Sequence, residues 1–241
     1  MEQRDYSLSV IVAGYNEQEN IEDCMQQLYQ MLQENYSDYE LILVDDGSKD
    51  DTPHLMQAFA QEHAHVRFLP NYINLNFGAS VARGLYAAQK DYAIYNAADL
   101  PLAAQDIPII LDEMHQQEAD VMVLERTGYQ TTRWRKITSN VNGLLLHIFF
   151  PRLIKGTPVL NFVQVFRTGI LDQIRTFARS PIFLWAEAVF RAKRCSLRVI
   201  NRPTACQVQK VRSGAFGHPH DILWGIYEML RFRIRLWTKN L

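Results

Sequence analysis

Three short polar clusters carry the residue types with which proteins bind nucleotides and metal ions. They occupy residues 14–17 (Gly-Tyr-Asn-Glu), 45–48 (Asp-Asp-Gly-Ser) and 96–99 (Asn-Ala-Ala-Asp). Carboxylates accept hydrogen bonds from the N–H and O–H groups of a base or ribose, and they also bind a divalent cation that bridges a diphosphate. The ring of Tyr15 could stack on a base. Together the clusters predict a site for a nucleoside diphosphate.

Each cluster directly follows a short apolar run of the kind that forms a buried strand. The run over 8–13 is rich in β-branched residues, and comparable runs lie at 41–44, 66–69, 92–95 and 121–124. Between these runs the spacing of apolar residues predicts helices over 21–32, from Thr52 onward, over 79–88 and over 105–117. Thr52 is expected to cap its helix, with Pro53 as the first helical residue.

The alternation of strands and helices predicts an α/β fold built on a mostly parallel sheet. Ligands of such sheets lie beyond the carboxyl ends of the strands, so the three clusters are expected to meet in one crevice. The second half of the chain is less regular. It predicts a helix over 136–150, short helices near Leu171 and Glu187, and a strand over 196–200.

The last stretch, 218–239, predicts a long helix with one apolar stripe. The stripe consists of Leu223, Tyr227, Leu230, Ile234 and Trp237, and basic residues outnumber acidic ones beside it. A basic amphipathic helix can lie on an anionic membrane surface. It can equally pack its stripe on the domain and expose its charges to solvent, and the sequence leaves both arrangements open.

Length and composition predict one globular domain over 1–241. Hydrophobic residues make up 48% of the 241 residues, and 25 basic residues against 26 acidic ones give a net charge of −1. Such a balance provides no overall basic field, so no nucleic-acid partner is expected. Three widely spaced cysteines, with no C-x-x-C pair and no long apolar run, favour a cytoplasmic protein.

Each polar cluster also has an ordinary structural explanation. Asp-Asp-Gly-Ser is a common turn sequence, Asn16 and Glu17 could open a helix, and Asp99 could cap one. Two other classes of nucleotide-binding protein are excluded by their motifs. The chain contains neither the G-x-G-x-x-G of dinucleotide oxidoreductases nor the G-x-x-x-x-G-K-[ST] of P-loop proteins.

Three segments resemble motifs of family 2 inverting glycosyltransferases with the GT-A fold. They are 8–17 (LSVIVAGYNE), 41–52 (LILVDDGSKDDT) and 76–84 (NFGASVARG), and the similarity looks closest to dolichol- or polyprenyl-phosphate mannosyl- and glucosyltransferases. The resemblance implies a GT-A-like (Rossmann-like) sheet flanked by helices. Within it, 1–125 would bind the nucleotide sugar, 126–217 would form the acceptor side, and 218–241 would be a basic amphipathic helix.

The resemblance also implies a reaction and its partners. A sugar would move with inversion from a GDP- or UDP-linked donor to a lipid-phosphate or cell-envelope glycan acceptor. The protein would work in the cytoplasm, peripherally on the cytoplasmic face of the membrane. Mg²⁺ or Mn²⁺ would assist by binding the diphosphate.

Site residues follow from the same resemblance. Tyr15, Glu17, Asp45 and Asp46 would line the nucleotide pocket. Asp99, the last acid of a D-x-D element, would hold the metal, and Asp99, Arg126 and Glu187 would be the catalytic residues. Glu187 would take a proton from a hydroxyl acceptor, or would instead be a helix acid paired with Arg191. The phosphate-binding residues would be Arg135, Lys136, Lys210 and Arg212.

The sequence departs from the family pattern at three places. Ala97 stands where the first acid of D-x-D is expected, Ala13-Gly14 replaces a proline-containing pair, and the acceptor segment near 161–167 is altered. These departures motivate an alternative, a catalytically degenerate nucleotide-sugar-binding or scaffold protein of the same fold. A pyrophosphorylase is disfavoured because no glycine-rich phosphate loop follows the first strand.

Overall fold

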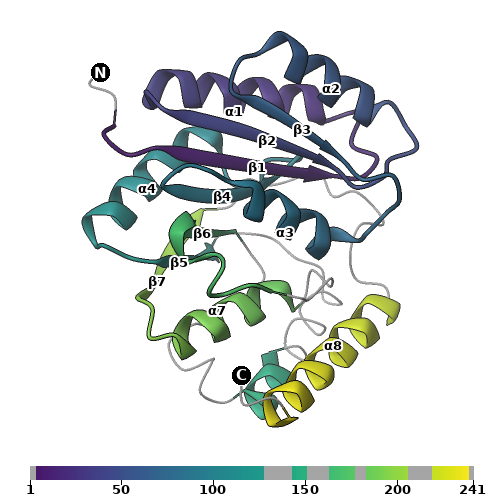
Figure 1. The fold of residues 1–241 in the computed structure, drawn as a ribbon, viewed down its shortest axis with the longest axis vertical. Helices are drawn as coiled ribbons and strands as arrows, with labels where there is room; N and C mark the ends of the chain where they lie inside the picture. Colours follow the sequence, from purple (N-terminus) through teal and green to yellow (C-terminus); the bar gives the residue numbers. More distant parts are fainter. Residues whose placement is uncertain (1–3, 128–142, 151–162, 177–182, 206–218, 239–241) are drawn as a thin grey trace.

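A seven-stranded sheet forms the centre of the computed structural model, which describes residues 4–127, 143–150, 163–176, 183–205 and 219–238 (Figure 1). The strand order is β3-β2-β1-β4-β6-β5-β7. The strands are β1 (Leu8–Gly14), β2 (Tyr39–Asp45), β3 (Val66–Pro70), β4 (Tyr92–Ala97), β5 (Val121–Thr127), β6 (Gln164–Arg167) and β7 (Val199–Ala205). Only β6 is antiparallel to its neighbours among these strands. The mostly parallel α/β sheet predicted from the sequence is confirmed.

Helices cover both faces of this sheet. On one face lie α1 (Ile21–Asn35), α2 (Thr52–Glu62) and α4 (Ile107–Gln116), the last preceded by the short η1 (Ala104–Asp106). On the other face lie α3 (Phe77–Ala87) and α7 (Leu184–Arg194), with the short η2 (Thr168–Ile170) after β6. Because both faces are covered, β2 is buried along its whole length, as expected of a continuous apolar run.

Two further helices pack beyond α7, one from the middle of the chain and one from its C-terminal part. They are α8 (Pro219–Thr238) and a short helix over 143–149. Phe232 of α8 places its ring 5.8 Å from Phe150, 5.5 Å from Phe183 and 5.4 Å from Phe190. This group of four aromatic rings joins α8, α7 and the 143–149 segment.

Several expected boundaries are wrong. Thr52 is the first residue of α2 and not its cap, because Asp50 accepts hydrogen bonds from both its N–H (3.0 Å) and its hydroxyl (2.6 Å). Helix α3 begins at Phe77, two residues earlier than predicted. Strand β7 starts later and extends to Ala205, because Asn201, Arg202 and Pro203 all pair with β5. Proline is tolerated there because β7 is an edge strand.

Gly84 lets α3 approach the sheet closely, and its replacement is expected to destabilise the fold. A Cβ atom at Gly84 would lie 2.4 Å from Cγ2 of Ile11 and 3.1 Å from Cγ2 of Val44. We expect Gly84→Ala to lower the free energy of unfolding by about 1–3 kcal/mol, the usual effect of overpacking a core. Urea unfolding measures the difference. Gly143→Ala is the matched control, since a Cβ there meets nothing within 4 Å; equal midpoints for the two variants would contradict this packing.

Candidate functional site

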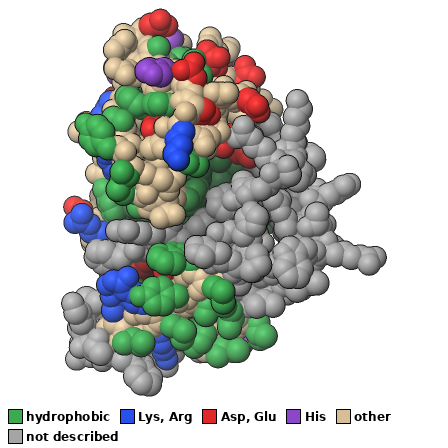
Figure 2. All heavy atoms as spheres, turned by 90° about the vertical axis from the view of Figure 1, so that its right-hand side faces the viewer, with side chains coloured by type: hydrophobic (Ala, Val, Ile, Leu, Met, Phe, Trp, Pro, Cys, Tyr) green, Lys and Arg blue, Asp and Glu red, His purple; other side chains and the backbone are tan. Residues whose placement is uncertain are grey.

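The carboxyl ends of β1, β2 and β4 lie side by side and bring the three polar clusters to one edge of the sheet. In the strand register Gly14 pairs with Asp45, and Ala13 pairs with Ala97. The N–H of Asp46 continues the pairing by donating to the carbonyl oxygen of Gly14 at 2.9 Å. The arrowheads of these strands point to the same side in Figure 1, and Figure 2 looks onto that side. The convergence predicted from the sequence is therefore present in the backbone.

The loop after β1 is fastened to the loop after β2. Asn16 adopts a positive φ of 55°, a conformation that asparagine tolerates better than most residues. Its N–H donates to the hydroxyl of Ser48 at 2.9 Å, and the N–H of Glu17 donates to the hydroxyl of Thr52 at 2.8 Å. These bonds fix the backbone directly after Tyr15, whose ring is exposed. A tyrosine held in this way is available to stack on a ligand.

Asp45 shapes the turn after β2. Its buried carboxylate accepts hydrogen bonds from the N–H groups of Gly47 at 3.1 Å and Ser48 at 3.2 Å. Gly47 has a positive φ of 75°, and a Cβ there would lie 2.6 Å from the carbonyl carbon of Ile73. Asp45 therefore stabilises a turn, the structural explanation that the sequence analysis gave for Asp-Asp-Gly-Ser. The turn packs tightly against the loop that contains Ile73.

Asp46 anchors the segment that leads into α3. One oxygen of its buried carboxylate, Oδ1, accepts hydrogen bonds from the N–H of Leu75 (2.8 Å), the hydroxyl of Ser80 (2.7 Å) and the amide of Asn71 (3.3 Å). The sequence did not single out Asn71 or Ser80. Ser80 does lie within the 76–84 segment that resembles the family, which is the one available signal. Asp46 therefore positions this loop at the edge of the site.

Glu17 and Asp99 act electrostatically on the same two buried groups. Burial raises the pKa of the Cys24 thiol, and the negative charges of Asp99 and Glu17 raise it further. Burial likewise raises the pKa of Tyr95, with the charge of Asp99 as the next largest cause and a contribution from Glu17. Cys24 also donates a long hydrogen bond, 3.8 Å, to the carbonyl oxygen of Ala97. Carboxylates from two clusters distant in the sequence thus both act on the pKa of Cys24 and of Tyr95.

Asn96 holds the loop that carries Asp99. Its fully buried amide donates to the carbonyl oxygen of Leu102 at 2.8 Å and faces the N–H of the same residue at 3.5 Å. Within the loop, Leu100 has a positive φ of 47° and donates its N–H to Ala97 at 2.9 Å. Asn96 is therefore a positioning residue, and its amide does not point into the site as a ligand-binding group.

A metal ion at this edge would depend on Asp99 and on the ligand itself. Ala97 offers no oxygen ligand from its side chain, and the described residues contain no group of three or more His, Cys, Asp or Glu that could hold a metal. Proteins commonly hold Mg²⁺ through one or two carboxylates plus the phosphates of a substrate. Exposed Asp99 fits a cation that arrives with a diphosphate.

The remaining predicted site residues lie farther along the chain. Glu187 in α7 is 2% exposed, and Arg191 donates to its Oε1 through Nη2 at 2.8 Å and Nε at 2.9 Å. The pairing with Arg191 that the sequence allowed is therefore present. Arg126 lies in β5 opposite Thr204. Its side chain lies outside what the structure describes, as do the residues Arg135, Lys136, Lys210 and Arg212.

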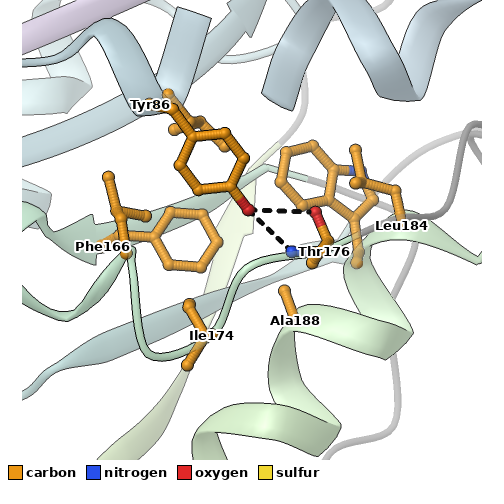
Figure 3. Close-up of a pocket in the computed structure, with 9 residues that line it drawn as sticks. Tyr86, Phe166, Ile174, Thr176, Leu184 and Ala188 are labelled. Carbon is orange, nitrogen blue, oxygen red and sulfur yellow. Dashed lines mark hydrogen bonds between the residues drawn. The ribbon is translucent and has the colours of Figure 1, made fainter. Parts of the chain in front are cut away.

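A cavity lies beside α7, and none of the predicted site residues lines it (Figure 3). It is enclosed mostly by apolar side chains of α3, β6 and α7, including Leu85, Phe166 and Ala188. Its lining includes the hydroxyls of Tyr86 and Thr176, and the Tyr86 hydroxyl accepts a hydrogen bond from the N–H of Thr176 at 2.7 Å. The cavity holds about 10 Å³, room for about one water molecule. It is a packing gap beneath the sheet and does not fit a nucleotide.

Solved structures of two synthases share this fold. Glucosyl-3-phosphoglycerate synthase from Mycobacterium tuberculosis, in complex with Mn²⁺, UDP and its product, matches with a TM-score of 0.70 and 16% identity, over 96% of this chain and 79% of that one. Mannosyl-3-phosphoglycerate synthase from Rubrobacter xylanophilus matches with a TM-score of 0.68 and 13% identity, over 98% and 75%. The GT-A-like fold expected from the sequence is confirmed.

Curated relatives match about half of the chain. Undecaprenyl-phosphate 4-deoxy-4-formamido-L-arabinose transferase from Pseudomonas syringae is 29% identical over 139 residues, 57% of this chain and 41% of that protein. Dolichyl-phosphate beta-glucosyltransferase from Dictyostelium discoideum is 31% identical over 118 residues, 46% and 36% of the two chains. The matched region thus spans about two fifths of the length of these relatives.

The family model named glycosyl transferase family 2 matches residues 9–175. This range contains all three polar clusters, all of β1 but its first residue, and every strand from β2 to β6. The chain therefore belongs to glycosyl transferase family 2.

Proposed function

We propose that this chain transfers a sugar, with inversion, from a nucleoside diphosphate sugar to a lipid phosphate. The observation that carries the proposal is the strand register, which brings the ends of β1, β2 and β4, and with them the clusters that contain Glu17, Asp45 and Asp99, to one edge of the sheet. Membership of glycosyl transferase family 2 supports the reaction class. The names of the undecaprenyl-phosphate and dolichyl-phosphate relatives support a lipid-phosphate acceptor.

The donor would bind across the ends of β1, β2 and β4. In this proposal the Tyr15 ring stacks on the base, and Glu17, Asp45 and Asp46 line the base and ribose pocket. The hydrogen bonds of Asp46 to the 71–80 loop support a rigid pocket wall, which reduces the entropy lost on binding. The UDP-bound structural neighbours favour a UDP-linked donor over a GDP-linked one.

Catalysis would consist of stabilising the departing diphosphate while the acceptor attacks. An acceptor oxygen forms a bond to the anomeric carbon as the bond from that carbon to the diphosphate breaks, and the negative charge moves to the leaving group. Arg126, Arg135, Lys136, Lys210 and Arg212 are the basic residues proposed to balance that charge. A divalent cation held by Asp99 would neutralise part of it when bound.

The surroundings of Glu187 favour a phosphate over a hydroxyl as the acceptor group. A hydroxyl acceptor needs a base that can reach its proton. Glu187, the proposed base, is almost fully buried, and Arg191 occupies one of its oxygens. A phosphate oxygen is already ionised at neutral pH, so it can attack without a base. Glu187 keeps a role as base only if the acceptor is a hydroxyl.

A lipid acceptor requires the protein to act at a membrane surface. No helix in the described ranges is long and apolar enough to cross a bilayer. We propose a peripheral position on the cytoplasmic face, where a reducing environment suits the exposed, unbridged Cys195. As the sequence analysis predicts, residues 1–125 would bind the donor and residues 126–217 would form the acceptor side.

A transfer assay tests the proposal. The full chain is incubated with UDP- or GDP-sugars, Mn²⁺ and undecaprenyl phosphate, and mass spectrometry follows formation of the lipid-linked sugar. We expect product with at least one donor. Donor binding without product, seen as a rise in melting temperature with the nucleotide sugar alone, would support the nucleotide-sugar-binding or scaffold alternative. If the chain does not bind the donor and forms no product, both functions are contradicted.

A further inference from the structure

A groove runs between α4 and the edge strand β7 (Figure 1). Its volume is about 200 Å³, twenty times that of the cavity beside α7. In the order of the sheet β7 is the third strand from β4, the strand that leads to Asp99. At the usual spacing of strands, about 14 Å of sheet separates the two. The groove therefore lies apart from the proposed nucleotide pocket, and we call it the α4–β7 groove.

Helix α4 and strand β7 run in opposite directions and define the two ends of the groove. Arg202 and Thr204 lie two residues apart in β7, so their side chains share one face of the strand. Arg202 donates from Nε to Oε2 of Glu113 in α4 at 2.6 Å, and this ion pair closes one end. Asp106 precedes α4 and lines the groove near the other end, seven residues and about 10 Å of helix from Glu113.

The polar groups that line the groove keep hydrogen-bonding capacity for a ligand. The hydroxyl of Thr204, a residue only 5% exposed, donates to the carbonyl oxygen of Arg202 at 3.2 Å, which leaves its lone pairs available as acceptors. Arg202 uses Nε for the ion pair, so its two Nη groups can donate. Asp106 is the N-cap residue of α4, yet its carboxylate makes no capping hydrogen bond. The groove thus offers acceptors near one end and a donor near the other.

The rest of the lining is apolar. Ile109 of α4 is 57% exposed, and Pro203 and Ala205 of β7 complete the lining. An apolar lining with a few placed polar groups is typical of sites for small ligands. A sugar matches this pattern, because its C–H groups can contact the apolar side chains while each hydroxyl can donate to a carboxylate or accept from a guanidinium.

The charges around the groove narrow the class of sugar. Asp106 and Glu113 contribute two negative charges and Arg202 one positive charge, so the local sum is −1. Asp106 would repel a phosphate or carboxylate group and attract an ammonium group. We propose that the α4–β7 groove binds a monosaccharide that is neutral or carries an amino group. The proposal does not depend on the transfer reaction, because it assigns a ligand to a different part of the sheet.

NMR titration of the full chain with three sugars tests the charge argument. D-glucosamine, D-glucose and D-glucose 6-phosphate share one ring, and at about pH 6 the first is cationic, the second neutral and the third anionic. We expect saturable binding of glucosamine and of glucose, with glucosamine about two- to fivefold tighter, the gain from one surface ion pair. Glucose 6-phosphate is expected to bind more weakly than glucose. The proposal is overturned if no sugar binds saturably or if glucose 6-phosphate binds tightest.

Two conservative variants test whether the sugar occupies the groove. Asp106→Asn keeps the size of the side chain and is expected to abolish the advantage of glucosamine over glucose. Thr204→Val keeps the shape but removes the hydroxyl, and it is expected to weaken binding of both sugars by about three- to tenfold. Circular dichroism and melting temperature check that the variants fold.

Asp172→Asn is the matched control, since Asp172 is an exposed aspartate that does not line the groove. We expect it to bind both sugars like the unchanged chain. If Asp106→Asn and Thr204→Val also bind like the unchanged chain, the sugar lies elsewhere and the proposal is wrong. Methyl β-D-glucoside identifies the source of the ligand: binding equal to that of glucose indicates a sugar linked within a larger molecule, and weaker binding indicates a free sugar.

Discussion

Replacing Asp99 with alanine is expected to lower the rate of sugar transfer by about 10²–10³-fold, the usual cost of removing one group that stabilises charge in a transition state. Asp99 is exposed at the end of β4, while Ala97 offers no second acid. The buried amide of Asn96 holds the surrounding loop through Leu102. We therefore expect Asp99→Ala to reduce kcat while leaving the melting temperature within a few degrees of the unchanged chain.

Steady-state kinetics with saturating donor and Mn²⁺ measure this effect. Glu62→Ala is the control, because Glu62 is an exposed acid at the far end of α2. We expect its kcat to be unchanged. If Asp99→Ala turns over at the full rate, Asp99 takes no part in the reaction and the proposed metal has no protein ligand. That outcome would contradict the role proposed for Asp99.

Replacing Asp46 with alanine is expected to destabilise the fold by about 2–4 kcal/mol, since each buried donor left without an acceptor costs about 1–3 kcal/mol. One carboxylate oxygen of Asp46 accepts hydrogen bonds from Leu75, Ser80 and Asn71. Alanine would leave these three donors without that acceptor. We also expect donor binding to weaken, because residues 71–80, which form the loop after β3 and the first turn of α3, border the proposed nucleotide pocket.

Urea unfolding and nucleotide titration separate the two effects. Asp46→Asn keeps an acceptor oxygen of the same size, so its stability is expected to fall between that of the unchanged chain and Asp46→Ala. Asp172→Ala removes an exposed carboxylate elsewhere and is expected to change stability by less than about 0.5 kcal/mol. If Asp46→Ala unfolds at the same urea concentration as Asp172→Ala, the anchoring role described for Asp46 is wrong.

The sheet and most of its helices were predictable because their signals are local. The apolar runs that became β1 and β2 are short and continuous, as burial on both faces demands. Strand β6 was not predictable in the same way. It inserts antiparallel between β4 and β5, and only contacts between distant segments place it there. The extension of β7 through Pro203 likewise depends on its partner β5 and not on its own composition.

The site was predictable at the level of strand ends but not of individual hydrogen bonds. Asp45 and Asp99 stood out because acids follow apolar runs. The partners that position the acids, Asn71, Ser80 and Thr52, are common polar residues whose importance comes from their neighbours in space. The sequence also left open which way the stripe of α8 points. Periodicity cannot decide this for a helix that has two apolar sides, and the structure exposes the stripe residues Leu223, Tyr227, Leu230 and Ile234.

A crystal structure of the chain with UDP and Mn²⁺ tests the central claim most directly. Our account predicts the nucleotide at the carboxyl ends of β1, β2 and β4, with the base beside Tyr15 and the diphosphate, with its cation, beside Asp99. A nucleotide bound at any other place on the molecule would contradict it.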